Sequence, residues 1–421
     1  MTFTNVRHLR RVAPPLASYL RVGQRDVSLM GKLLDQGFTV GAGLIVDPSA
    51  VERTAEMRDV AVENGVEVIL DTRGVELSTI GGLAMPSVAK LRWAATRPYT
   101  PSDLSAARGA VVASLIAETA IAQKVTGVLA HTHLLDQVDP WLDVDANLVG
   151  ELRIALDSNG AGSTSIYYPL IAPLQLLRDE PSIVRIIDAL QVLVTERKID
   201  GIFLRVQGFG TRFAGPRNLR SYINVARGLH GLGVPLVAER TGCVGVALAA
   251  FGAVGGVESS VTYGEAYDAR RLKHESKGKG FLPPPRVYIS GAMLTIPVEQ
   301  ARAIFTRRGF GRLACDRSCC RGGREATLQD PRRHFVVTRA AELSDMSAIP
   351  SSERPENFLT RSLTPARETS AQIARFDSSF EKHRNRLDDW NLALRHTLAA
   401  DRLAQPTVAI VPTGHRLLTG A

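Results

Sequence analysis

Three cysteines and a histidine form the most specific chemical motif in the sequence. Cys315, Cys319, Cys320 and His334 follow the spacing C-x3-C-C-x13-H. Three thiolates and one imidazole are a ligand set for a structural Zn²⁺ ion. Such an ion would hold together the polar, glycine-rich segment Arg321 to Arg324, which has little apolar surface to bury. Free thiols remain the alternative, because adjacent cysteines depart from the C-x2-C spacing of strong zinc motifs.

A second group of chemically capable side chains follows short apolar runs. The run Val66 to Leu70 ends in Asp71, Arg73 and Glu76. Polar residues directly after a buried parallel strand lie at the open end of a sheet. Any one of them could be a turn residue or a helix cap, but together they predict a mouth where carboxylates, imidazoles and guanidiniums meet. The complete set is Asp47, Asp71, Arg73, His131, His133, Tyr168, Arg205, Gln207, Glu239, Arg240 and Glu258.

Within this set we predict two kinds of role. Asp71, Glu239 and Glu258 are the candidate catalytic groups, because two carboxylates facing a substrate can divide nucleophilic attack and proton transfer. Planar guanidinium groups suit a phosphate or a purine edge, and six of the other members, the arginines among them, are predicted to bind substrate. These predicted substrate-binding residues are Arg73, His131, His133, Arg205, Gln207 and Arg240.

The two histidines of this set allow a metal site in the same mouth. His131 and His133 are two residues apart, so on a strand both side chains would face the same side and could share an ion. No third ligand is evident nearby in the sequence. This favours the alternative that the pair binds substrate or forms hydrogen bonds within its loop.

The elements that must position these residues alternate between β-branched runs and amphipathic helices. Such alternation predicts repeated βαβ units, and eight of them favour a (β/α)8 barrel with one common mouth. Residues 1–36 are predicted as an irregular lead-in with a helix at its end. No GxGxxG motif follows a strand, which argues against dinucleotide binding. The expected strands span residues 38–46, 66–70, 126–130, 163–168, 201–206, 234–238, 254–260 and 286–289.

Three segments are predicted from the change of pattern after the last of these strands. The barrel would span residues 1–292, a zinc-binding insertion residues 293–343, and a linker with a C-terminal helical arm residues 344–421. Within this arm, Ser344 to Thr369 is predicted as a polar surface linker and Ala371 to about Leu403 as one long helix. Pro406 to Val411 is predicted as a strand-like run.

Charge and composition bear on partners and location. The net charge is +9, and residues 271–421 hold 25 basic and 15 acidic side chains, whereas residues 1–270 hold 26 and 27. This asymmetry points to a polyanionic partner, with nucleic acid first, and a merely solvated arginine-rich surface stays open as an equal alternative. No apolar run approaches the roughly 20 residues that cross a bilayer, and no apolar region follows the N-terminal arginines. We therefore predict a soluble, cytoplasmic protein with no membrane partner.

A barrel followed by a Cys, Cys, Cys, His site and a basic C-terminal region resembles the tRNA-guanine transglycosylase superfamily, which includes relatives that insert deazaguanine bases into DNA. Ile69-Leu70-Asp71-Thr72-Arg73-Gly74-Val75-Glu76 is similar to the family's strand-ending Asp-Ser-Gly-Gly-Phe-Gln. The resemblance implies that Asp71 acts on the exchanged base. It also implies structural Zn²⁺ at a respaced C-x-C-x2-C…H motif, tRNA or DNA as substrate, and a modified base as second substrate.

The sequence departs from this family at two places. The family's nucleophilic Asp follows the last strand, but Ser290-Gly291-Ala292-Met293 contains no carboxylate. Its glycine-rich base-recognition signatures are echoed only by Gly255-Gly256-Val257-Glu258. Glu239, Glu258 or Asp71 itself would then attack the sugar. Two alternatives stay open: a small-molecule barrel lyase, aldolase or hydrolase, and a catalytically decayed relative that only binds nucleic acid. The oligomeric state is also open, a homo-oligomer included.

Overall fold

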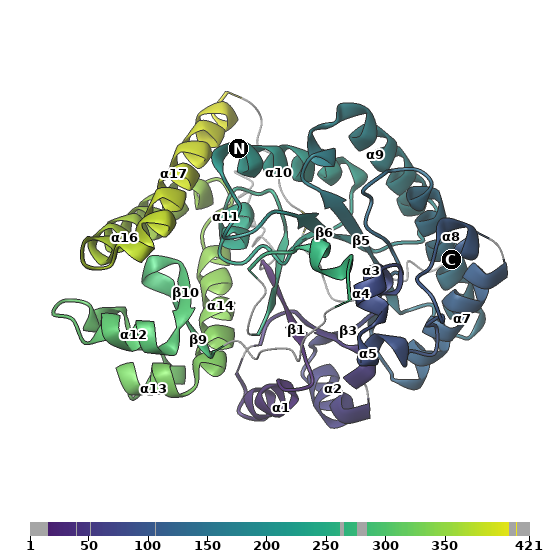
Figure 1. Ribbon diagram of the computed structural model, residues 1–421, viewed down its shortest axis with the longest axis horizontal. Helices are drawn as coiled ribbons and strands as arrows, with labels where there is room; N and C mark the ends of the chain where they lie inside the picture. The colour runs from purple at the N-terminus through teal and green to yellow at the C-terminus, as the bar shows by residue number, and fades with distance from the viewer. Residues whose placement is uncertain are drawn as a thin grey trace, which may run out of the picture.

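The computed structural model describes residues 16–403 and residue 410, apart from residues 39, 51, 106, 262–264 and 276–283. Eight parallel strands close into a barrel in the order of the sequence (Figure 1). The predicted (β/α)8 barrel is therefore confirmed. Its strands are β1 (Ala17–Val22), β2 (Gly43–Val46), β3 (Glu67–Asp71), β4 (Gly127–Leu129), β5 (Ser165–Pro173), β6 (Gly201–Gln207), β7 (Leu236–Glu239) and β8 (Gly256–Ser260).

Helices surround this barrel between successive strands (Figure 1). The long connection after β3 contains four one-turn helices, α3 (Gly74–Leu77), α4 (Ile80–Leu83), α5 (Pro86–Ala89) and α6 (Pro101–Leu104). None of the helices within the described ranges combines the length and apolarity needed to cross a membrane. The main barrel helices are α1 (Val27–Asp35), α2 (Ala55–Glu63), α7 (Ala107–Ala122), α8 (Trp141–Ser158), α9 (Glu180–Thr195), α10 (Pro216–Leu229), α11 (Val244–Ala250) and α14 (Pro331–Ser347).

The predicted set of barrel strands is wrong at both ends. β1 lies within the residues predicted to be an irregular lead-in and helix, and it pairs with both β2 and β8 to close the barrel. Arg286–Ile289, predicted as the eighth barrel strand, is β9 and pairs antiparallel with β10 (Leu294–Pro297) outside the barrel. Val287 and Ile289 pack in a separate apolar cluster with helix α12 (Val298–Phe305). The apolar pattern of residues 286–289 therefore predicted a strand correctly, but it could not show that this strand belongs to a separate two-stranded sheet.

The C-terminal region is not organised as predicted. The segment of β9, β10, α12 and α13 (Arg324–Gln329) lies between β8 and α14, and α14 packs against β1, so the barrel is completed beyond the predicted boundary at residue 292. The predicted surface linker is helical, with α15 (Arg354–Asn357) and a π-helical turn (Phe358–Leu363) leading into α16 (Thr364–Phe376). Phe358 and Leu363 are fully buried, which explains the helical packing of this polar-looking stretch.

The predicted long C-terminal helix is divided in two. α16 ends at Phe376, and α17 (Glu381–Asp401) begins after Asp377, whose side chain accepts a hydrogen bond from the Ser379 backbone N–H. The two helices pack against each other beside α10 and α14 (Figure 1). The strand-like run predicted for Pro406 to Val411 lies outside the described residues, apart from Ile410.

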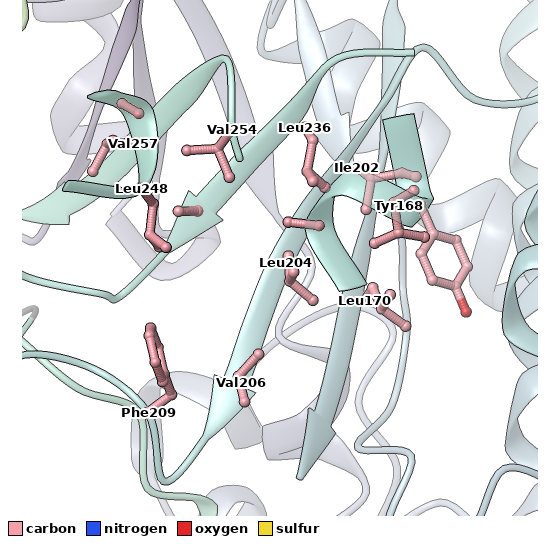
Figure 2. Packing of buried hydrophobic residues seen from close by; sticks show 14 of the residues in the cluster. Tyr168, Leu170, Ile202, Leu204, Val206, Phe209, Leu236, Leu248, Val254 and Val257 are labelled. Carbon is pink, nitrogen blue, oxygen red and sulfur yellow. The ribbon is translucent and has the colours of Figure 1, made fainter. Parts of the chain in front are cut away.

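Side chains alternate along each barrel strand between an outer and an inner layer. On β6, Ile202, Leu204 and Val206 point outward and pack with residues of neighbouring strands and α11 (Figure 2). Phe203 instead belongs to a separate cluster inside the barrel, and Arg205 follows it two residues later on the same side. Because inward-facing side chains recur every two residues, the barrel interior has an aromatic layer near the start of the strands and a polar layer nearer their carboxyl ends.

The aromatic layer near the start of the strands surrounds one carboxyl group. Glu67 is buried and accepts hydrogen bonds from the hydroxyls of Tyr167 (2.7 Å) and Tyr19 (3.2 Å). Gly43 leaves room for this layer, because a Cβ there would lie 2.6 Å from the Tyr19 ring. Burial raises the pKa of Glu67 to about 7, although the two hydroxyls oppose the shift.

This raised pKa predicts a stability that falls as pH rises. Between the ordinary Glu value, about 4.3, and the folded value, the folded chain binds more protons than the unfolded chain. Glu67→Gln removes that difference, so the stability of the variant relative to wild type should grow by about 2–3 kcal/mol between pH 5 and pH 8. Urea unfolding at a series of pH values checks this. Glu299→Gln, whose side chain is 82% exposed, is the control, and a pH-independent Glu67→Gln difference contradicts the assignment.

Candidate functional site at the barrel mouth

Arg21 on β1 is the centre of the polar layer at the mouth. Its guanidinium donates hydrogen bonds to Asp71 from β3, to Glu239 from β7 (2.5 Å) and to Glu258 from β8 (3.1 Å). Arg205 on β6 lies opposite Glu239 in the sheet register and donates to the same carboxylate oxygen. The predicted convergence of Asp71, Arg205, Glu239 and Glu258 is therefore confirmed as geometry.

Sequence reasoning missed Arg21, although it contacts all three predicted catalytic carboxylates. The cause is the missed strand β1, since a residue in an irregular lead-in has no predicted direction. The alternating run Ala17-Ser18-Tyr19-Leu20-Arg21-Val22 after two prolines was the available signal. With a strand there, Arg21 falls on the same side as Tyr19 and at the carboxyl end.

Exposure separates the three carboxylates. The side chains of Glu239 and Glu258 are 0% exposed, whereas the Asp71 side chain is 10% exposed. The two glutamates thus lie beneath Arg21 and Arg205 and hold those guanidiniums in place. Of the three predicted catalytic groups, Asp71 is the one in contact with solvent in this structure.

Asp71 is held in its ionised form. Burial alone would raise its pKa, but the guanidiniums of Arg21, Arg73 and Arg205 outweigh burial and lower the pKa below the ordinary range. A backbone hydrogen bond from the Arg73 N–H to Asp71 Oδ1 (3.1 Å) acts in the same direction. An ionised carboxylate is suited to act as a nucleophile or to stabilise positive charge, not to donate a proton.

Arg73 links Asp71 to a second, partly accessible carboxylate. Its Nη1 lies 3.9 Å from Asp71 Oδ2 and 3.0 Å from Glu76 Oε1, and its Nη2 donates to Asp47 at 3.0 Å. Arg73 also has a positive φ of 60°, a conformation that non-glycine residues rarely adopt and that concentrates at functional sites. Asp71 Oδ2 and Glu76 Oε1 therefore both lie close to the same guanidinium nitrogen, so the two carboxylates are neighbours.

Arg240 and Gln207 lie at neighbouring strand ends. Arg240 has a φ of 54°, and its backbone N–H donates to Glu258 Oε2 (2.9 Å) while its guanidinium lies 5.9 Å from the centre of the Tyr267 ring. Gln207 ends β6 and pairs through its backbone with Tyr267. Tyr267, which was not predicted, thus connects the ends of β6 and β7 across the mouth.

The two predicted histidines are buried at the end of β4 and face a carboxylate that was not predicted. His133 Nδ1 lies 2.5 Å from Asp145 Oδ1, and its ring stacks on Trp141 at 3.9 Å. Burial and the neighbouring His133 lower the pKa of His131 well below its usual range, so His131 is neutral. Among the described residues no third ligand completes a metal site around this pair.

A cavity of about 740 Å³ opens at the mouth, next to Arg73 and Glu76. Its lining includes Arg73 and Glu76, but also residues after β6 and β8 and from β9 and β10. The arginines outnumber the carboxylates in this lining, so the cavity favours an anionic ligand. Its lining arginines are Arg73, Arg212, Arg240, Arg271 and Arg286, and its lining carboxylates are Glu76, Glu265 and Asp268.

The Cys, Cys, Cys, His motif gathers at one point, away from the mouth. One ligand atom from each of Cys315, Cys319, Cys320 and His334 lies within 4.8 Å of the others. Cys315 Sγ and Cys319 Sγ are 3.8 Å apart, which matches the edge of about 3.8 Å that Zn–S bonds of about 2.3 Å give a tetrahedron. His334 Nε2 lies 2.7 Å from the Tyr288 carbonyl, an arrangement that leaves Nδ1 for a metal. The residues fit a metal ion; Zn²⁺ as its identity stays a prediction.

Removal of this metal should loosen the segment between α12 and α14. Cys319→Ser is expected to lose about one equivalent of bound metal and to lower the melting temperature, because the ion supplies folding free energy that this polar segment lacks. Elemental analysis and thermal melts with and without chelator measure both effects. Cys243→Ser is the matched control, since Cys243 is a free, buried cysteine outside the cluster. Full metal content in Cys319→Ser would refute the assignment.

Comparison with known proteins adds no family to this description. No protein-family model and no curated protein matches the chain. Solved structures with similarity include a GH18 chitinase from Pseudoalteromonas aurantia (15% identity, 58% of this chain and 93% of that chain, TM-score 0.38). Another is xylanase10C from Cellvibrio japonicus (15%, 62% and 66%, TM-score 0.37). A third is the carboxyl transferase domain of Rhizobium etli pyruvate carboxylase (11%, 95% and 59%, TM-score 0.37). Similarity this low carries no argument about activity.

Proposed function

We propose that this chain is a base-exchanging transglycosylase that acts on a nucleic acid, with Asp71 as the attacking carboxylate. The observation that carries the proposal is an ionised Asp71, with 10% of its side chain exposed, in contact with Arg73, which lines an arginine-rich cavity at the barrel mouth. The resemblance of residues 69–76 and of the Cys, Cys, Cys, His site to the tRNA-guanine transglycosylase superfamily supports base exchange as the reaction. It gives Asp71 a role on the exchanged base, so the assignment of Asp71 as nucleophile rests on its ionisation and its contact with solvent.

The chemistry follows from the positions of these groups. An Asp71 oxygen attacks the anomeric carbon of the sugar, the bond to the old base breaks, and the base leaves with the bonding electron pair. A nitrogen of the incoming base then attacks the same carbon and releases Asp71 as a carboxylate. The target base must leave its stack to reach a barrel mouth, and the cavity offers room for it. Arg73 and Arg240 lie where they can bind the phosphate or the base edge.

Trapping of the covalent intermediate tests this proposal. The full chain, mixed with tRNA or with a DNA oligonucleotide and quenched, should give a protein–nucleic acid adduct that survives a denaturing gel. Asp71→Asn should give none, whereas Asp136→Asn, an exposed carboxylate in the β4–α8 connection, should behave as wild type. If the wild-type chain forms no adduct with either nucleic acid, this proposal is wrong, and a binding-only relative or a small-molecule enzyme remains.

A small-molecule hydrolase is the second candidate, because Arg73 brings two carboxylates close together. Asp71 and Glu76 both lie near Arg73 Nη1, and glycosidases use such a pair of neighbouring carboxyl groups. Glu76 would then activate a water molecule in place of an incoming base. Release of free sugar without transfer, lost in Glu76→Gln, distinguishes hydrolysis from base exchange.

A further inference from the structure

A second cavity continues the first one away from the mouth. It has a volume of about 310 Å³ and shares Arg212, Glu265, Arg286 and Thr295 with the cavity next to Arg73 and Glu76. Its far side is formed by Lys382 and Arg386 in the first turns of α17, and by the preceding turn at Ser379 and Phe380. The two cavities therefore form one path from the barrel mouth, past the β9–β10 sheet, to α17. We call this path the basic track.

The charges along the basic track are unbalanced. Lysines and arginines outnumber carboxylates in both parts, and Glu265 is the one carboxylate that lines the outer part. Five of the cations take part in no ion pair among the described residues, namely Arg212, Arg240, Arg271, Lys382 and Arg386. Burial and the nearby Arg212 lower the pKa of Arg386, so these two cations also repel each other. An anion bound here would relieve that repulsion.

An aromatic side chain lies exposed among these cations. Phe213 lines the inner cavity, and its side chain belongs to the few large apolar groups left exposed, at 44%. Exposed aromatic rings in a basic groove are the means by which proteins stack the bases of single-stranded nucleic acid. An acidic protein segment would use the cations but would leave the ring without a flat partner.

We infer that the basic track binds a single strand of nucleic acid, with phosphates on Arg212, Lys382 and Arg386 and one base stacked on Phe213. This inference rests on the proposed function for its biological meaning, since it places the strand that leads to the flipped base. It specifies which face of the molecule the strand crosses, from the mouth over β9–β10 to α17. Binding is measurable without turnover.

The first test measures the salt dependence of binding. A fluorescein-labelled single strand of about 20 nucleotides, as DNA and as RNA of the same sequence, is titrated with the full chain between about 50 and 200 mM NaCl. The double variant Lys382→Gln, Arg386→Gln should lower the slope of log K against log salt by about 1.4, because each lost phosphate contact on a single strand contributes about 0.7. The double variant Arg384→Gln, Arg395→Gln, on the same helix but outside both cavities, should keep the wild-type slope.

The second test isolates stacking. Phe213→Ala should weaken binding of the normal strand by about tenfold or more and leave binding of an abasic strand of the same length unchanged, and Phe213→Tyr should restore the affinity. Absence of binding at low salt, an unchanged slope in the Lys382, Arg386 variant, or equal losses from the control pair overturns the inference. So does an equal loss for the normal and abasic strands in Phe213→Ala. If the chain binds the strand through the basic track but forms no covalent adduct, the transglycosylase proposal is wrong and the inference about the basic track still holds.

Discussion

Arg21→Met should destabilise the folded chain by about 3–5 kcal/mol, the largest stability effect that we expect from one substitution at the mouth. Arg21 is nearly enclosed, with 11% of its side chain exposed, and it forms ion pairs with three carboxylates at once. Methionine fills a similar volume but leaves Glu258 and Asp71 without this cation. Urea unfolding at neutral pH measures the loss.

The pH dependence distinguishes charge from packing in this variant. Arg21 lowers the pKa values of Asp71 and Glu239, against the effect of their burial. The stability that it contributes is therefore present above the unfolded pKa values, about 4, and is lost as pH falls through the folded ones. The difference between wild type and Arg21→Met should thus be greatest near pH 7 and shrink toward pH 3. Arg92→Gln, which breaks an exposed pair with Glu118, should cost less than about 1 kcal/mol. A pH-independent Arg21→Met difference would assign the loss to packing.

Asp71→Asn should lower the rate of base exchange by at least about 10³-fold, the largest effect on activity that we expect. Asparagine has nearly the same shape and can still accept the Arg73 backbone hydrogen bond, but it cannot form the glycosyl ester. Release of a radiolabelled base from the nucleic acid substrate measures the rate. Strand affinity should stay near the wild-type value, because the basic track does not include Asp71.

The wild-type pH profile provides an independent check of the same residue. Because the pKa of Asp71 is below the ordinary range, the nucleophile stays ionised at pH 5, and the rate should show no acid limb near pH 4–5 that belongs to this group. A variant that retains more than about a tenth of the wild-type rate is incompatible with Asp71 as the nucleophile. In that case Glu76 is the next carboxylate to replace.

The barrel and much of its mouth could be predicted from the sequence because period-two alternation and strand ends are local signals. Asp71, Glu239 and Glu258 follow clear apolar runs, and they do converge. Arg21 was missed because its short strand, interrupted by a serine and an arginine, was read as part of an irregular lead-in. Asp145 and Tyr267 escaped for a different reason: they lie in a helix and in a loop, and only the tertiary fold brings them to the strand ends.

Burial was the other quantity that the sequence could not supply. A strand-end glutamate looks the same whether it faces a substrate or a guanidinium, and Glu239 and Glu258 proved to face Arg21 and Arg205. The same holds in the C-terminal region, where charged residues around Phe358 hid a packed helical turn. By contrast, the metal motif was predictable because cysteine and histidine side chains have few other reasons to cluster.

Helix α14 carries His334 of the candidate metal site in its first turn and ends against the first strand of the barrel. The same helix therefore anchors the ion at one end and seals the cylinder at the other. By mass action each tenfold rise in free metal above the dissociation constant adds about 1.4 kcal/mol to the stability of whatever folds with the ion. If an ion binds there, metal supply would thus set how firmly the strand that carries Arg21 is held.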